Sequence, residues 1–195
     1  FKLTKENKYQ YFSTAFLSLT LAFIAKIIGT LAIYKPTITR SALGSSIHQT
    51  FTSLTPYNIN ALAFIAYIFF MLLGFMILFL IISRLRWKNQ RVIALLLYFV
   101  FLATWIGVIH YQLFYLTSFV LLLLITYSYY QNYKEIKSEN ARFVVIAFGI
   151  LLVSQAFFVF VVYSRIIYVL AELTQLLGFV YLLIPFILIF KKKPK

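Results

Sequence analysis

The sequence contains no cysteine, which excludes disulfides, thiolate metal sites and palmitoylation. Acidic residues are also scarce, with 4 Asp and Glu against 18 Lys and Arg and a net charge of +14. The sequence therefore offers few acidic residues for catalysis by paired carboxylates. The chain also lacks a Gly-rich phosphate loop and the His-Glu-x-x-His and Gly-x-Ser-x-Gly patterns. We expect a non-enzymatic protein with no metal site and no cofactor.

Charged residues of either sign make up only 11% of the chain, whereas 63% of the residues are hydrophobic. Soluble domains carry about 45–50% apolar residues. So few charged residues cannot form a water-facing surface around so apolar a chain. The composition therefore predicts an all-α, polytopic membrane protein, because a helix satisfies its own backbone hydrogen bonds in lipid.

A helix that crosses the membrane needs about 20 mainly apolar residues. Six segments of the sequence meet this length and predict six transmembrane helices arranged as three hairpins. They are residues 12–34, 59–83, 92–112, 113–131, 143–164 and 166–190.

The third and fourth segments run together without a charged residue, so we expect a bend at His110-Tyr111-Gln112. The fifth and sixth are separated only by Ser164-Arg165, which predicts a tight hairpin. The longest connection, residues 35–58, is rich in Ser and Thr. Its apolar residues recur at helical spacing, which predicts an amphipathic helix on the outer interface or a lid over the helices.

Basic residues predict the orientation of the chain. They concentrate at 2–8, 84–91, 134–142 and 191–195, and only Lys35, Arg40 and Arg165 lie on the opposite side. Because Lys and Arg mark cytoplasmic loops, both termini are expected in the cytoplasm of a multi-pass cell-membrane protein. The same basic stretches predict contact with anionic lipids at the cytoplasmic face. No basic stripe of domain size exists, so nucleic-acid binding is not expected.

Two parts of the sequence resemble each other and predict a parallel internal repeat, residues 8–83 with 140–190. Ala15-Phe16 matches Ala147-Phe148, and Leu72-Leu73-Gly74-Phe75 matches Leu176-Leu177-Gly178-Phe179. The glycine in each match is expected to let a neighbouring helix approach closely.

Ionisable side chains within the membrane are costly and are the first place to look for function. Lys26 and Glu172 are the two within the expected spans. Counted from the outer boundary, Lys26 lies about 12 Å deep and Glu172 about 9 Å deep. Opposite charges at nearly equal depth can form an ion pair.

Further polar and aromatic side chains fall at the same depth and predict a polar cluster in the outer half of the helices. They are Gln155, Gln175, Tyr67, Thr104 and Trp105. Glu172 and Gln175 are three residues apart and therefore share one helical face. Three interpretations stay open: structural hydrogen bonding between helices, a ligand or ion site, or Lys26 extending alone to the outer headgroups.

These observations favour a sensory or accessory subunit of a larger membrane assembly, with protein partners or a fused cytoplasmic domain. A small transporter or channel that uses Lys26 and Glu172 is the alternative. A lipid-modifying enzyme is a third candidate, for which the sequence offers no recognisable nucleophile or base.

Overall fold

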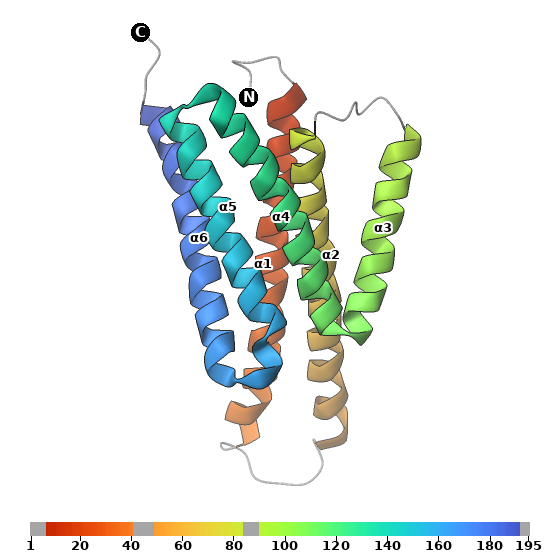
Figure 1. Ribbon diagram of the computed structural model, residues 1–195. Coiled ribbons are helices and arrows are strands. Elements are labelled where there is room, and N and C mark those ends of the chain that lie inside the picture. The colour runs from red at the N-terminus through yellow and green to blue at the C-terminus, as the bar shows by residue number, and fades with distance from the viewer. Residues whose placement is uncertain (1–6, 41–48, 84–89, 192–195) are drawn as a thin grey trace. The chain divides into compact units, whose positions relative to one another are not determined.

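The computed structural model describes residues 7–40, 49–83 and 90–191, and in these ranges it contains helices and no strand (Figure 1). The all-α prediction is confirmed. The helices are α1 (Asn7–Arg40), α2 (Gln49–Ile82), α3 (Gln90–Ile109), α4 (Tyr111–Ile136), α5 (Glu139–Val159), the short 3-10 turn η1 (Val161–Tyr163) and α6 (Arg165–Lys191).

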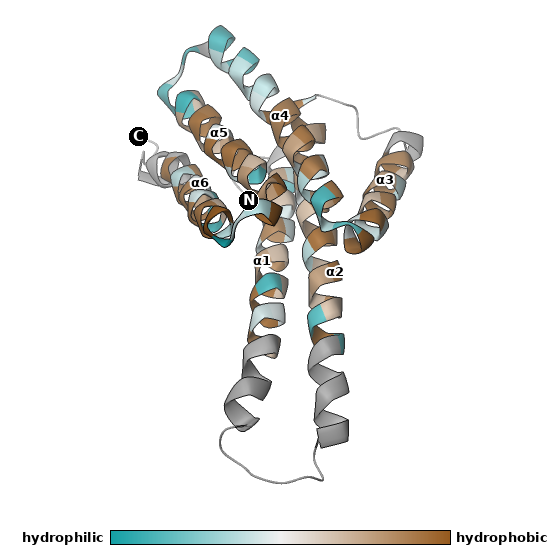
Figure 2. Ribbon diagram, turned by 60° about the horizontal axis from the view of Figure 1, so that its bottom comes forward, coloured by the Kyte–Doolittle hydropathy of each residue, from teal (hydrophilic) through white to brown (hydrophobic). Residues whose placement is uncertain are grey.

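Five of the six α-helices contain an apolar stretch long enough to cross a membrane. These stretches are Gln10–Ala32, Asn58–Ile82, Tyr111–Glu135, Glu139–Val159 and Arg165–Ile184. The apolar part of α3 that the structure describes, Ile93–Ile109, is shorter than a full span. Figure 2 shows hydrophobic residues along the helices and hydrophilic ones where α4 passes into α5. Five candidate spans are therefore established, and the sixth span and the orientation of the termini stay predictions.

The expected break between the third and fourth segments falls at His110, where α3 has ended at Ile109 and α4 begins at Tyr111. His110 has φ −128° and ψ 88°, which are not helical angles. In the connection 35–58, α1 continues to Arg40 and α2 begins at Gln49, so helix extends into both ends of that segment. Residues 41–48 lie outside the described part, and the amphipathic outer helix stays a prediction.

The helices form two compact units. The first contains α1, α2 up to Ile77, and α3; the second contains the end of α2 from Leu78, together with α4, α5 and α6.

In the first unit, α1 and α2 pack closely along an antiparallel contact. A Cβ added to Gly74 of α2 would lie 2.7 Å from Leu19 Cγ and 3.2 Å from the Ala15 carbonyl oxygen, both in α1. The Ser18 hydroxyl donates a hydrogen bond of 2.9 Å to the Phe70 carbonyl oxygen. The absence of a side chain at Gly74 is therefore what permits the two helices to come this close.

In the second unit, α5 lies between α4 and α6 and packs on both (Figures 1 and 2). A Cβ added to Gly178 of α6 would lie 2.6 Å from Leu151 Cδ2 and 3.2 Å from the Leu151 backbone nitrogen. On its other side, α5 meets α4 through two stacked ring pairs, Tyr115 with Phe158 and Tyr129 with Phe148.

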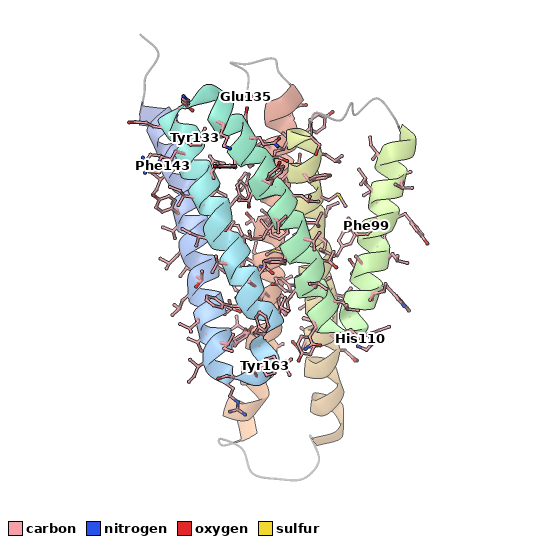
Figure 3. All side chains as sticks on the ribbon, viewed as in Figure 1. Phe99, His110, Tyr133, Glu135, Phe143 and Tyr163 are labelled. Atoms are coloured by element: carbon pink, nitrogen blue, oxygen red, sulfur yellow. The ribbon has the colours of Figure 1, made fainter. Side chains whose placement is uncertain are left out.

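The two ends of the α4–α5–α6 unit are closed by short, capped connections. Lys137 ends α4 in the left-handed conformation, and the Ser138 hydroxyl accepts a hydrogen bond from the Ala141 amide to begin α5. At the opposite end, the Ser164 hydroxyl accepts from the Ile166 amide as α6 begins. Glu135 and Tyr163 mark these two ends in Figure 3. We call the end at Tyr163 and Ser164 the α5–α6 end.

Candidate functional site

The close approach of α5 and α6 brings two buried glutamines to one level. Leu151 of α5 contacts Gly178 of α6, and the two helices run antiparallel. Gln155 follows Leu151 by one turn toward the α5–α6 end, and Gln175 precedes Gly178 by almost one turn in the same direction. Their exposed fractions are 0% and 1%. The sequence-based placement of both residues at one depth agrees with this register.

The polar atoms of both glutamine amides are buried. Within the described part of the chain, neither Nε2 nor Oε1 of Gln155 or of Gln175 has a hydrogen-bond partner. A buried polar group left unbonded costs about 1–3 kcal/mol. Four such atoms at one level of a helix pair are far from the usual pattern, because buried polar groups are normally bonded.

α4 adds a third polar side chain, Ser118, to the same level. Tyr115 stacks on Phe158 with ring centroids 4.7 Å apart and planes at 6°. Ser118 follows Tyr115 by three residues, and Gln155 precedes Phe158 by three residues on the antiparallel α5. Ser118 is fully buried, and its Oγ has no hydrogen-bond partner among the described residues. We call Ser118, Gln155 and Gln175 the inner polar layer.

Aromatic rings cover the inner polar layer on the side of the α5–α6 end. Phe158 stacks on Tyr115 and makes an edge contact with Tyr168, with centroids 6.0 Å apart. Tyr115 precedes Ser118 in α4, Phe158 follows Gln155 in α5, and Tyr168 precedes Gln175 in α6. Each ring therefore lies nearer to the α5–α6 end than the layer does. We call Tyr115, Phe158 and Tyr168 the aromatic cover.

Glu172 lies beside the aromatic cover, almost one turn of α6 from Gln175. Its side chain is half-buried, and it lies within electrostatic range of Tyr115. Glu172 and Gln175 both lie in α6, three residues apart, so they share one helical face. The second unit therefore gathers three of the predicted site residues: Gln155, Gln175 and Glu172.

Lys26 and Tyr67 come together in the first unit. The Lys26 Nζ lies 5.3 Å from the centroid of the Tyr67 ring, which is a cation–π contact. Tyr67 is buried and Lys26 half-buried. Lys26 and Glu172 belong to different units, and their ion pair stays a prediction.

The remaining predicted residues lie on α3. Trp105 is 74% exposed and faces away from the inside of its unit. Thr104 is buried, and its hydroxyl donates to the Val100 carbonyl oxygen of its own helix at 2.8 Å. Neither contributes an unbonded polar group to the inside of the unit.

Sequence reasoning missed Ser118 and the three residues of the aromatic cover. Ser118 lies five residues after the start of the predicted segment 113–131, about 8 Å deep and close to the depth assigned to Glu172. The same count applied to the fourth segment could have found it. A Ser or Thr in a span does not by itself indicate a site, because its hydroxyl usually bonds the backbone of its own helix, as that of Thr117 does with the Leu113 carbonyl oxygen.

The residues described here contain no group of three or more His, Asp or Glu side chains placed to hold a metal ion. Of the two histidines in the sequence, His110 is described and His48 lies outside the described residues. No protein-family model, no curated protein and no solved structure matches this chain.

Proposed function

We propose that this protein is a non-enzymatic integral membrane domain, a sensory or accessory subunit that binds a small polar molecule in the inner polar layer. Its five long apolar helices are compatible with an integral membrane protein. The proposal places the binding site in the half of the membrane that contains the α5–α6 end. Protein partners, or a fused cytoplasmic domain, would receive the signal.

The unbonded amides of Gln155 and Gln175 carry this proposal. Glutamines that only held helices together would bond each other or a nearby carbonyl oxygen and so contribute to stability. Unbonded amides do the opposite, because burial removes water from them without replacement. A ligand that supplies the missing hydrogen bonds would remove this cost, and ligand binding therefore explains why the amides are present in an apolar core.

A small transporter is the second candidate, favoured by the similar close contacts at Gly74 and Gly178. Parallel repeats of helical segments are common in transporters. If the predicted Lys26–Glu172 pair exists, it would add a charged site of the kind that marks substrate or ion pathways.

Stability measurements separate a binding layer from structural hydrogen bonding. Methionine is close to glutamine in length and brings no unbonded polar atom, so Gln155→Met with Gln175→Met should remove a cost. We expect the double variant in detergent to be more stable to unfolding by about 1–3 kcal/mol. A loss of stability of similar size would show that the amides are structural and would contradict the proposed site.

Flux measurements separate the subunit from the transporter. The purified chain is reconstituted in liposomes, and glycerol or urea entry is followed by light scattering. A sensory or accessory subunit gives rates equal to those of empty liposomes. Entry that is faster, and that Gln155→Met slows, would support the transporter instead.

A further inference from the structure

We infer that the inner polar layer takes a small, neutral molecule that carries both hydrogen-bond donors and acceptors, such as a primary amide or a short polyol. This inference rests on the proposed function, since it names the ligand class of the same site. It follows from the chemistry of the unbonded atoms and from what surrounds them.

The layer offers donors and acceptors together. Each glutamine amide has two N–H donors and a carbonyl acceptor, and the Ser118 hydroxyl can do both. All five of these heavy atoms are unbonded in the described part of the chain. A cation would take only the oxygens and an anion only the N–H and O–H groups, and either would leave amide atoms of the other kind without a bond. Only a ligand with both functions satisfies the layer.

The surroundings also disfavour a net charge. Ser118, Gln155 and Gln175 are all neutral, and they lie in helices with mainly apolar neighbours such as Phe158 and Leu151. An ion placed here would be buried without a counter-charge in the layer itself, which is costly at membrane depth. The half-buried Glu172, beside the aromatic cover and almost one turn of α6 from Gln175, would repel an anion.

The polar atoms that a ligand would have to reach lie within a short length of the unit. Ser118, Gln155 and Gln175 fall within about one helical turn of each other along the unit, a length of about 5 Å. Toward the α5–α6 end, the stacked rings of Tyr115 and Phe158 limit the layer. Toward the opposite end, the contact of Leu151 with Gly178 leaves no space between α5 and α6. A molecule with a few heavy atoms matches these bounds.

The absence of cysteine allows a direct test with the full chain reconstituted in liposomes. Ser118→Cys places a single thiol in the inner polar layer with little change in size. Leu116→Cys, on the same helix at nearly the same depth but 47% exposed, is the lipid-facing control. Tyr163→Cys, at a residue that is 80% exposed at the α5–α6 end, calibrates each reagent.

The probes are three methanethiosulfonates that differ in charge: the neutral hydroxyethyl, the cationic trimethylammonium-ethyl and the anionic sulfonatoethyl reagents. Relative to Tyr163→Cys, we expect the neutral reagent to label Ser118→Cys about tenfold or more faster than either charged reagent. Acetamide or glycerol should slow this labelling. Leu116→Cys should react slowly with all three reagents.

Two other results overturn the inference in different ways. If a charged reagent labels Ser118→Cys as fast as the neutral one, the ligand class is wrong, but a solvent-reached binding layer, and the proposed function with it, survives. If no reagent labels Ser118→Cys faster than Leu116→Cys, the layer is closed and dry, and both the inference and the proposed site fail. Ser154→Cys, fully buried next to Gln155 on α5 and little changed in size, repeats the test from a second helix in case Ser118→Cys does not fold.

Discussion

The α1–α2 and α5–α6 hairpins use the same packing contact but enclose different side chains. In each, a glycine of the second helix meets a leucine of the first: Gly74 with Leu19, and Gly178 with Leu151. The shift that relates Ala15 to Ala147 also relates Leu19 to Leu151, and it places Phe23 at the position of Gln155.

Likewise, the shift from Gly74 to Gly178 places Met71, fully buried, at the position of Gln175. The hairpins therefore show that close helix packing here needs the glycine and the leucine and does not need the amides. The inner polar layer is an addition to a packing pattern that also works with apolar side chains. The internal repeat itself stays a prediction.

The largest expected effect comes from filling the glycine contacts. Gly178→Ala would put a methyl group 2.6 Å from Leu151 Cδ2, and Gly74→Ala one 2.7 Å from Leu19 Cγ. Overpacking of this kind costs about 1–3 kcal/mol. We expect both variants to unfold at lower concentrations of SDS, as followed by circular dichroism.

Gly149 in α5 provides the matched control, because a Cβ added there meets nothing within 4 Å. Gly149→Ala should leave stability unchanged or raise it by up to about 1 kcal/mol through better helix propensity. If all three alanine variants behave alike, close approach at Gly74 and Gly178 is not what holds the hairpins together.

Exchanging the buried residues between the hairpins sharpens the comparison. Met71→Gln buries a new amide in the α1–α2 contact region, at a position where the side chain is fully buried. The variant should lose about 1–2 kcal/mol of unfolding free energy, whereas Gln175→Met should not. Changes in unfolding free energy of equal size and opposite sign in the two variants would identify the amide as the cause. An increase in stability for Met71→Gln would contradict this interpretation of the two hairpins.

A smaller effect is expected at the cation–π contact of the α1–α2 hairpin. In a double-mutant cycle of Lys26→Met and Tyr67→Leu, the coupling energy should be about 0.5–2 kcal/mol. Tyr67→Phe keeps a ring beneath the ammonium group and should retain most of that coupling. Additive effects of the two substitutions would show that the ring does not stabilise Lys26.

The sequence predicted the helices better than their ends. The apolar runs and the break near His110 follow directly from the need to satisfy backbone bonds in lipid. The continuation of α1 to Arg40 and the start of α2 at Gln49 could not be read from a Ser- and Thr-rich segment. For α3, the described apolar stretch, Ile93–Ile109, is shorter than a full span, so the sixth span stays a prediction.

The candidate site was predicted in part. Counting residues from the span ends brought Gln155 and Gln175 to one depth, because helical rise fixes depth. Depth does not determine the direction in which a side chain points. Trp105 was therefore predicted as a site residue from its depth, although its side chain is exposed. The unbonded state of the amides depends on how three helices pack, which no local pattern in the sequence encodes.

An experimental structure of the protein in lipid, at a resolution that shows ordered water, tests the central claim most directly. The account predicts density for a small molecule or for water within hydrogen-bond distance of both the Gln155 and Gln175 amides. Gln155 bonded directly to Gln175, with no density beside them, would contradict it.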